Sequence, residues 1–520
     1  MLVNEMNRVA IGDMVRRTAG RVPNKAAFVD GDVELNYKQL DEKTNQFAHY
    51  LLNNGYQKGD CIATIAGNSY EHAIAFFGLA KAGMTWVPIN PGISLAEKQY
   101  ILEEVEATTI LGDPAFLFNN LEDFKHYSLY VFGDEAPKAG TSFISTLENQ
   151  STEEPEVDIQ DRDIAQIMFT SGTTGNPKGV MISHQSVFIA SLANIIEIDI
   201  KPHTKATIMM PMFHCAQHTF LASFVHIGAT CVVIKGFEPA SLMQTVQDES
   251  ISLMFALPIM YKAILFHPNR EQYDLSSLDT CVYAMAPMDR STLEKGIKEF
   301  GAKFALGTGQ TEMYPATMVF KPEEQLRRFG SYWGTSSLIN DTAIMDDEGN
   351  ILPDGQVGEI VHRGPNVMSG YLNNDEASEQ TREFNWHHTG DLGYWDEDGQ
   401  MVFVDRKKDI IKTGGENVAS IKVEQTILNH PSVGNAVVVG LPHERWSEAV
   451  TAFVVPAEGK ELTKEEVISY CKEHLGAFQV PKDVLIVDEL PMTTTGKIQK
   501  HRVRTQFQSH YMQGNPMERN

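Results

Sequence analysis

The chain has 520 residues, more than one hydrophobic core usually supports, so we expect at least two domains. Hydrophobic residues make up 42% and charged residues 21%, the balance of an ordinary globular protein. Lys and Arg total 43 against 68 Asp and Glu, a net charge of −25. This acidic balance argues against nucleic acid as a partner, because phosphate backbones are bound by clustered cations.

The five cysteines are scattered and form no CxxC pair, which predicts a reduced, cytoplasmic protein. No uncharged apolar segment reaches the roughly 18 residues that a transmembrane helix needs, so none is expected. Near the start of the chain, residues 11–17 form a short amphipathic helical pattern rather than a signal peptide. The sequence leaves a homodimer open.

Strand-like apolar runs alternate with helical patterns along most of the chain. We expect strands over 61–66, 85–88, 164–169, 206–210 and 231–235, and helices over 70–82 and 184–194. This alternation predicts a layered α/β architecture. The acidic stretch 141–163 is expected to be a loop that leads into the strand at 164.

Beyond Gly355, short alternating runs over 358–361 and 401–404 predict a β-rich subdomain. A charged turn, Asp405–Asp409, then leads into a compact α+β pattern. We therefore predict a multidomain α/β protein. A large N-terminal domain over 1–405 combines layered α/β sheets with the β-rich subdomain, and a small mobile α+β domain covers 406–520.

The densest local signal lies between Phe169 and Gly179, where glycines and hydroxyl residues follow a buried strand and precede a helix. Glycines let backbone N–H groups approach a polyphosphate closely, and a lysine adds a mobile cation. A Walker A loop cannot be threaded onto this run, and the alternative is a Ser/Thr/Gly-rich surface loop. The candidate phosphate-binding residues are Thr170, Ser171, Gly172, Thr173, Thr174, Gly175 and Lys178.

This loop resembles the phosphate loop of the adenylate-forming superfamily, which includes acyl-CoA synthetases, peptide-synthetase adenylation domains and firefly-type luciferases. Segments similar to the family's other signatures follow in order from about residue 35 to about residue 500. The likeness to acyl-CoA synthetases is strongest. It implies that a carboxylic acid reacts with ATP and Mg²⁺ to give an acyl-adenylate and pyrophosphate, and that coenzyme A then takes the acyl group and releases AMP.

Gly307–Met313 is similar to the family's aromatic-Gly-x-Thr-Glu segment. The resemblance implies that Glu312 holds Mg²⁺ together with Thr174, since carboxylate and hydroxyl oxygens suit this hard cation. It also implies that Gly309, Gln310 and Thr311 contact the nucleotide. Thr308 departs from the pattern, because the family usually has an aromatic ring stacked on adenine there. For this segment alone, a Gly-rich turn with a solvated glutamate is the alternative.

Two further signatures imply the ribose site and the catalytic lysine. Asp391 lies in a Thr-Gly-Asp signature, and Arg406 is implied to contact the same ribose. Lys497, in the segment Pro491–Ile498, matches the family's catalytic lysine. A substrate carboxylate is already ionised, so its attack on the α-phosphate needs positive charge rather than a general base. Lys408, two positions after Arg406, is implied to be the hinge of a domain rotation.

The second half-reaction needs a thiol at the same carbonyl. Rotation about the hinge would bring Gly414 and Gly415 to the site, where a backbone edge without side chains lines a channel for pantetheine. Arg445 and Trp446 are candidates for a phosphate and the adenine of coenzyme A. Gln479 stands where many CoA-using relatives have lysine, so a carrier-protein phosphopantetheine is the alternative acceptor.

His214 resembles the family residue that lies beside the substrate carboxylate, and it joins Lys497, Thr170 and Glu312 as a predicted catalytic residue. No acidic residue occurs in the segment 215–219 that follows, which disfavours an amino-acid substrate. A fatty or other apolar acid is expected, and an aryl acid fits almost as well. The predicted acyl pocket consists of Phe213, His214, Ala284, Met285 and Ala286.

Overall fold

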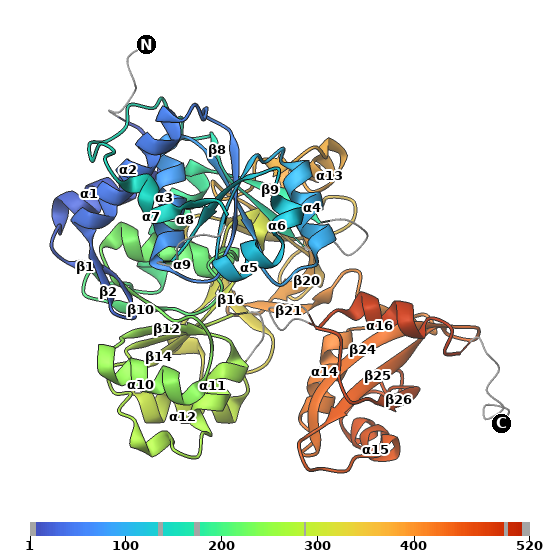
Figure 1. Cartoon of the computed structure of the whole chain (residues 1–520). Coiled ribbons are helices and arrows are strands. Elements are labelled where there is room, and N and C mark those ends of the chain that lie inside the picture. The colour runs from blue at the N-terminus through green and yellow to red at the C-terminus, as the bar shows by residue number, and fades with distance from the viewer. Residues whose placement is uncertain (1–6, 134–138, 171–176, 285–287, 493–497, 512–520) are drawn as a thin grey trace. The chain divides into compact units, whose positions relative to one another are not determined.

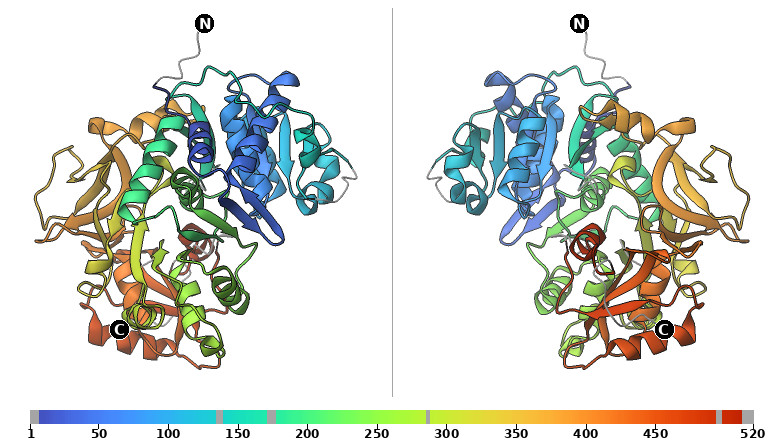
Figure 2. Two further views of the ribbon diagram at one scale, coloured as in Figure 1. Left: turned by 90° about the vertical axis from the view of Figure 1, so that its left-hand side faces the viewer. Right: turned by 90° about the vertical axis from the view of Figure 1, so that its right-hand side faces the viewer.

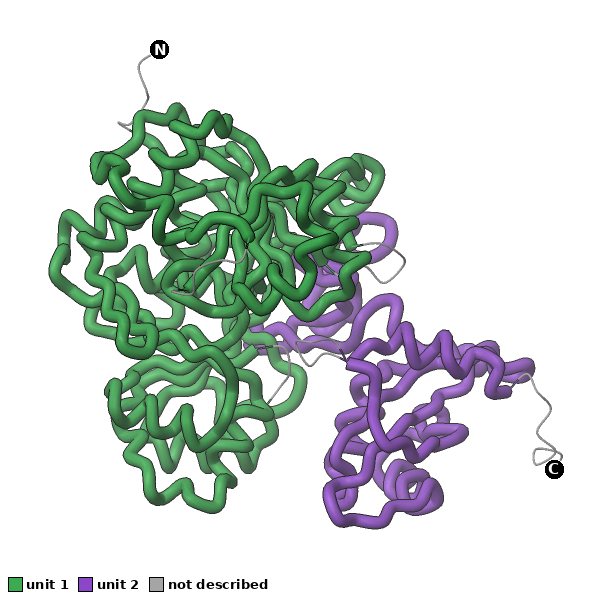
Figure 3. Tube along the Cα trace, in the orientation of Figure 1, with its two compact units in different colours: residues 1–342, 362–388 green, residues 343–361, 389–520 purple. Residues whose placement is uncertain are grey.

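The computed structural model describes residues 7–133, 139–170, 177–284, 288–492 and 498–511. The chain divides into two compact units, coloured separately in Figure 3. Unit 1 comprises Met1–Thr342 and His362–His388, and unit 2 comprises Ala343–Val361 and Thr389–Asn520. Residues 389–405, which the prediction places in the N-terminal domain, therefore belong to the same compact unit as the C-terminal residues. The domain boundary predicted between residues 405 and 406, at the charged turn, stays a prediction.

Unit 1 contains two sheets (Figure 1). Strands that are neighbours in the order of each sheet are hydrogen-bonded to each other. Within this unit, the strand order of the first sheet is β16 (Tyr332–Ser336), β15 (Met318–Phe320), β14 (Lys303–Thr308), β13 (Thr280–Tyr283), β12 (Leu253–Ala256), β10 (Lys205–Ile208), β11 (Thr230–Val233), β1 (Ala26–Asp30) and β2 (Val33–Asn36). The second runs through β19 (Gly370–Tyr371), β9 (Lys178–Ser183), β8 (Ile164–Thr170), β4 (Thr85–Ile89), β3 (Cys61–Ile65), β5 (Thr109–Gly112), β6 (Ser128–Val131) and β7 (Thr141–Ser142).

Helices cover both sheets. Their bounds are α1 (Ile11–Arg21), α2 (Tyr37–Asn53), α3 (Tyr70–Ala82), α4 (Leu95–Glu104), α5 (Pro114–Asn119), α6 (Leu121–Phe124), α7 (Phe143–Leu147), α8 (His184–Glu197), α9 (Cys215–Ile227), α10 (Pro239–Glu249), α11 (Pro258–Leu265), α12 (Arg290–Phe300) and α13 (Asp375–Gln380). Short 3-10 turns are η1 (Arg270–Gln272), η2 (Thr311–Met313), η3 (Pro322–Glu324) and η4 (Glu383–Asn385). Capping boxes begin α2 at Asn36 and α4 at Ser94, where the first backbone N–H groups would otherwise lack partners.

Three apolar cores bind these elements into layers. Helices α10, α11 and α12 pack against one face of the first sheet. Helices α1–α3, α8 and α9 share the largest core with the inner faces of both sheets. Figures 1 and 2 show the helices and sheets of this unit from three directions. Helices α4–α6 cover the outer face of the second sheet. The predicted layered α/β class is therefore confirmed.

Two local predictions need correction. The segment 141–163 is not a loop throughout, because it contains β7 and α7. Phe143 explains the helix, since its buried ring lies 4.9 Å from that of Phe47 and 5.0 Å from that of Phe132, measured between centroids. A strand, β9, also intervenes between the candidate phosphate loop and helix α8, which begins at His184 as predicted.

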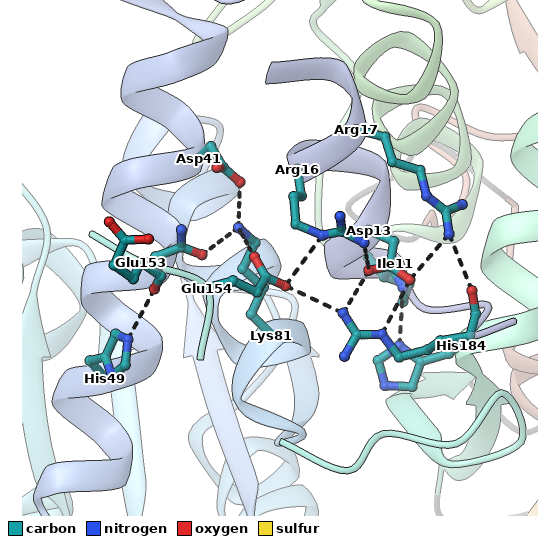
Figure 4. A network of polar contacts seen from close by, with 12 residues as sticks. Ile11, Asp13, Arg16, Arg17, Asp41, His49, Lys81, Glu153, Glu154 and His184 are labelled. Carbon is teal, nitrogen blue, oxygen red and sulfur yellow. Dashed lines mark hydrogen bonds and ion pairs between the residues drawn. The ribbon is translucent and has the colours of Figure 1, made fainter. Parts of the chain in front are cut away.

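The first helix is fastened to unit 1 by an ionic network (Figure 4). Arg8 and Arg16 both pair with the buried Asp13, at 2.6 and 2.9 Å. Glu154 continues the network to Lys81, whose ammonium group is completely buried and lies 3.3 Å from the Glu154 carboxylate. Buried charges are stable only when they are paired in this way. The network therefore ties α1 and α3 to the chain just before β8.

Unit 2 combines a β-rich part with an α+β part. Three of its strands extend by two residues each into the part of the chain assigned to unit 1. Its elements are β17 (Asp341–Met345), β18 (Gly358–Arg363), β20 (His387–Trp395), β21 (Met401–Arg406), β22 (Ile411–Thr413), β23 (Glu416–Val418), α14 (Ser420–Leu428), β24 (Val433–His443), β25 (Ser447–Pro456), α15 (Lys464–His474), β26 (Asp483–Ile486) and α16 (Lys500–Phe507). The last sheet runs β23-β22-β25-β24, with β26 beside β25. Among the described residues, no helix has the length and apolar character that crossing a membrane requires.

Candidate active site

The β8–β9 hairpin frames the candidate phosphate loop. Its strands pair antiparallel, and Thr170 lies directly opposite Lys178 at the end of the ladder. Both residues are half-buried and border the loop as predicted. The predicted residues Ser171, Gly172, Thr173, Thr174 and Gly175 lie outside the described residues.

Glu312 lies on the short turn η2, which begins at Thr311, shortly after β14 ends at Thr308. The Tyr371 hydroxyl donates a hydrogen bond to Glu312 Oε1 at 3.0 Å. The backbone N–H of Met368 donates to the Glu312 carbonyl oxygen at 2.8 Å. Asn366 donates from Nδ2 to the Met313 carbonyl oxygen at 2.7 Å. One segment, 366–371, therefore holds the turn in place.

Tyr371 was not among the residues that the sequence singled out. Burial, followed by the charge and hydrogen bond of Glu312, raises the pKa of Tyr371 well above its usual value. The hydroxyl therefore stays protonated and acts as the donor. The Lys178 ammonium group lies 5.0 Å from the centroid of the Tyr371 ring, within the range of a cation–π contact. A tyrosine in a Gly-Tyr pair offers no periodic pattern that would have identified it.

Thr308, Gly309 and Gln310 connect the end of β14 to the turn η2. His387 Nε2 lies 3.4 Å from Gln310 Oε1. Gly309 is exposed, and a Cβ there would lie 2.6 Å from the Cβ of Pro315, so glycine is required by this close approach. Thr308 Oγ1 is buried without a hydrogen-bond partner within the described part of the chain.

His214 caps the N-terminus of α9. Its Nδ1 accepts a hydrogen bond from the Ala216 backbone N–H at 3.3 Å, so the proton of the neutral ring sits on Nε2. Nε2–H is the group that can donate to a carboxylate. Asn68 fixes the preceding segment, because its Oδ1 accepts from the Met212 N–H at 2.8 Å and its Nδ2 donates to the carbonyl oxygen of Met210 at 3.0 Å.

Cys215 lies between His214 and Thr311. Its Sγ lies 3.8 Å from His214 Nδ1 and 3.4 Å from Thr311 Oγ1. The thiol is buried, with 5% of its surface exposed. The residue predicted to orient the carboxylate and a residue predicted to contact the nucleotide therefore both touch one side chain. No sequence signal marked this cysteine.

The described part of the predicted acyl pocket is small. Phe213 and Ala284 are half-buried, and Ala284 packs at the edge of the largest core, just after β13. Met212 is buried in that core. Met285 and Ala286 lie outside the described residues.

In unit 2, the structure brings the two predicted ribose residues together. Asp391 on β20 lies opposite Arg406 on β21, and Arg406 Nε approaches Asp391 Oδ1 to 3.5 Å. Only 8% of the Asp391 side chain is exposed, against 36% for Arg406. The pair presents a carboxylate and a guanidinium at one place, as a site for two hydroxyl groups needs.

The predicted hinge residue, Lys408, is exposed and lies between two anchored aspartates. Asp405, fully buried, accepts a hydrogen bond from the Ser420 hydroxyl at 2.6 Å at the start of α14. Asp409 pairs with Arg504 of α16 at 2.8 Å. Although much of the Lys408 side chain is exposed, the partial loss of solvent around its ammonium group, followed by the charge of Arg406, lowers the pKa of Lys408. Its role as a hinge stays a prediction.

The candidate CoA residues also converge. Gly414 and Gly415 form the turn between β22 and β23 with φ values of 61° and 91°, which favour glycine. The Gly414 N–H donates to the Trp446 carbonyl oxygen at 2.9 Å, and the Arg445 guanidinium lies 5.5 Å from the Trp446 ring centroid. Gln479 Oε1 accepts from the Gly476 N–H at 3.2 Å. The catalytic candidate Lys497 lies outside the described residues.

Comparison with known proteins is consistent with this arrangement. The model of the AMP-binding enzyme family matches residues 15–372, and the model of the AMP-binding enzyme C-terminal domain matches residues 422–497. A feruloyl-CoA synthase from Amycolatopsis sp is 30% identical over 503 residues, covering 96% of this chain and 100% of that protein. The long-chain-fatty-acid–CoA ligase FadD13 of Mycobacterium tuberculosis is 30% identical over 511 residues, covering 96% and 98%.

Solved structures of CoA ligases and synthetases have a similar fold over most of the chain. An anthranilate CoA ligase in complex with anthranoyl-AMP superposes with a TM-score of 0.87 at 25% identity, covering 97% of this chain and 99% of that one. A Mycobacterium tuberculosis fatty acyl CoA synthetase superposes with a TM-score of 0.78 at 28% identity, covering 96% and 99%.

The chain belongs to the AMP-binding enzyme family, and thus to the adenylate-forming superfamily. Within that superfamily it is an AMP-forming acid–thiol ligase.

Proposed function

We propose that the chain is an ATP-dependent carboxylate–CoA ligase for an acid with an apolar body. The observation that carries the proposal is the meeting of His214 and Thr311 at Cys215, at 3.8 and 3.4 Å. An acyl-adenylate joins a carboxylate to the α-phosphate, so the residues that hold the two groups must lie this close together. The Nε2–H of His214 then donates to the carboxylate, and Thr311 contacts the α-phosphate region.

In the first half-reaction, a carboxylate oxygen attacks the α-phosphorus and pyrophosphate leaves. Lys497 supplies positive charge between the two anions and stabilises the charge that develops in the transition state. Asp391 and Arg406 hold the ribose. Thr170 and Lys178 border the loop that cradles the leaving phosphates.

The residues present fit Mg²⁺. Within the described ranges, no cluster of three or more His, Cys, Asp or Glu side chains could enclose a metal ion. Mg²⁺ keeps several waters and is usually bound through one or two carboxylates and the substrate phosphates. Glu312 offers such a carboxylate, which is half-buried and accepts a hydrogen bond from the Tyr371 hydroxyl. We assign it, with Thr174, to this ion, which neutralises phosphate charge when bound.

In the second half-reaction, the CoA thiol loses its proton to solvent and the thiolate attacks the acyl carbon; the bond between the acyl carbon and the AMP oxygen breaks, and AMP leaves with the bonding electrons. Rotation about Lys408 brings the Gly414–Gly415 turn to the site, and Arg445 and Trp446 bind the nucleotide part of CoA. Their mutual contact in the structure supports this assignment. The alternative acceptor is a carrier-protein phosphopantetheine, for which Gln479 is the reason.

The acid is apolar, either fatty or aromatic. The half-buried Phe213 and Ala284 offer no charge, and the residue after His214 is a thiol rather than an acid. The relatives named feruloyl-CoA synthase and long-chain-fatty-acid–CoA ligase act, by their names, on acids of these two kinds. We also propose a cytoplasmic location, because all five cysteines are free thiols.

A panel of fatty, aryl and amino acids, assayed for pyrophosphate release with and without CoA, tests the proposal. Apolar acids should support release and amino acids should not. Activity on an amino acid alone would contradict the substrate class. Adenylation without CoA-dependent AMP release would favour the carrier-protein alternative.

A further inference from the structure

Tyr371 occupies a position that the proposed chemistry does not yet use. It lies on β19, a strand of two residues that pairs with β9 of the phosphate-loop hairpin, with Tyr371 opposite Val180. The backbone on either side extends this pairing, because the N–H groups of Ser369 and Leu372 donate to the carbonyl oxygens of Met181 and Gly179, both at 2.8 Å. The tyrosine is therefore fixed to the hairpin by its main chain.

The same segment also holds the turn that carries Glu312. Met368 donates to the Glu312 carbonyl oxygen at 2.8 Å, and the Tyr371 hydroxyl donates to its carboxylate at 3.0 Å. The Tyr371 ring is buried, with 7% exposed, and its backbone N–H donates to Ser378 Oγ at 2.8 Å. Neither ring nor main chain is free to drift, so the hydroxyl has a defined direction.

The direction of this hydrogen bond matters for a metal ligand. The hydroxyl engages Oε1, and Oε2 accepts no hydrogen bond from any described residue. Carboxylates that bind metals are commonly oriented by such outer partners, whose loss typically costs about 10–100-fold in metal affinity. On the other side, the Lys178 ammonium group lies 5.0 Å from the ring centroid. Tyr371 thus stands between a candidate metal carboxylate and a candidate phosphate-binding cation.

We propose that Tyr371 is a positioning residue that orients the Glu312 carboxylate for Mg²⁺ at the nucleotide phosphates. The inference rests on the proposed role of Glu312 in holding that ion. In this proposal, the Tyr371 hydroxyl, and not its ring, is the group that affects Mg²⁺ binding.

Tyr371→Phe tests this, because it removes the hydroxyl and keeps the ring that packs in the core and contacts Lys178. ATP binding is measured by calorimetry in EDTA and across a Mg²⁺ titration. We expect the Mg²⁺ concentration for half-maximal tightening of ATP binding to rise about tenfold, with ATP affinity in EDTA unchanged. Tyr56→Phe is the matched control, since it removes another partly buried hydroxyl that contacts Thr109 at 2.7 Å.

A second comparison separates positioning from general damage. If Tyr371 acts through Glu312, adding Tyr371→Phe to Glu312→Gln should change the Mg²⁺ response no further. An unchanged Mg²⁺ response in Tyr371→Phe, or an equal loss in the Tyr56→Phe control, overturns the inference while the proposed ligase activity stands. A wild-type protein that binds ATP equally with and without Mg²⁺ overturns both the metal assignment of Glu312 and this inference.

Discussion

His214 caps helix α9, and we propose that it also orients the substrate carboxylate; a single substitution can separate these two roles. Its Nδ1 caps α9 through the Ala216 N–H, and this leaves Nε2–H for the substrate carboxylate. Asparagine is also a good N-cap residue, so His214→Asn should preserve the helix and remove only the second task.

We expect His214→Asn to lower kcat/KM for the acid about 10–100-fold, since a hydrogen bond to a charged group contributes about 1.5–3 kcal/mol. KM for ATP should change little, and the thermal unfolding midpoint should stay that of the wild type. Steady-state kinetics with each substrate varied in turn measures the split. An equal loss toward acid and ATP would show that His214 does not act on the carboxylate.

At the scale of single residues, the sequence could single out side chains that carry reactive or charged groups of their own. Glu312, Asp391, Arg406 and His214 were predicted, and the structure places Asp391 with Arg406 and sets His214 near Thr311 through Cys215. Residues that act through others were missed. Tyr371, Asn68 and Cys215 contact the site because of the tertiary fold, and no spacing along the chain encodes those contacts.

At the scale of elements, two kinds of contact hold helix α1 in place: the ion pairs of Asp13 and a hydrogen bond to an uncharged histidine, His184. The Ile11 N–H donates to His184 Nδ1 at 3.3 Å, and burial lowers the pKa of His184 from 6.5 to about 4 (Figure 4). The nearby cations Arg8 and Lys58 also lower this pKa, whereas the carboxylates of Asp163 and Asp13 partly oppose the shift. A histidine whose pKa is depressed on folding contributes stability that is present above pH 6.5 and is lost as the pH falls toward about 4.

From these values, His184 should contribute about 2 kcal/mol of the stability that is lost on going from neutral pH to about pH 5. His184→Gln should therefore show a smaller fall in unfolding midpoint over that interval than the wild type. Urea unfolding at the two pH values measures it. His203→Gln, at an exposed histidine, is the control and should behave as the wild type. An unchanged pH response in His184→Gln would refute the account.

Element types and many boundaries were predictable because local patterns determine them. The helix over 70–82 and the strand at 164 agree with α3 and β8 at the residues where they begin. The segment 141–163 was misread, because the burial of Phe143 against Phe47 and Phe132 is a tertiary effect that an acidic composition hides. Strand β9 was missed because its pairing partner, β8, lies on the far side of the glycine-rich loop.

At the scale of the whole molecule, the proposed reaction needs the chain to present first Lys497 and then the thiol to one carbonyl. We propose Lys408 as the hinge of this change; it is exposed and lies between Asp405 and Asp409, which are both tied to C-terminal helices. Proline at this position would fix φ near −65° and stiffen the turn.

Lys408→Pro should therefore keep acid-dependent exchange of pyrophosphate into ATP within a few-fold of the wild type and lower CoA-dependent AMP release by at least about tenfold, as loss of a required conformational step does. Lys408→Ala, which removes the same side chain and leaves φ free, is the control for substitution at this position. Equal losses in both half-reactions would argue against a hinge at Lys408.

The fold class and family were accessible from the sequence because motifs and alternating elements span most of the chain. The identity of the acid was not, since a pocket's shape depends on side chains brought together from several strands and loops.

The central claim is tested most directly by acid-dependent exchange of labelled pyrophosphate into ATP, followed by CoA-dependent release of AMP, in wild type and Lys497→Ala. The account predicts exchange with an apolar acid, AMP release only when CoA is added, and loss of about 10²–10³-fold in exchange in the variant. Exchange that is independent of any carboxylate, or undiminished in Lys497→Ala, would contradict it.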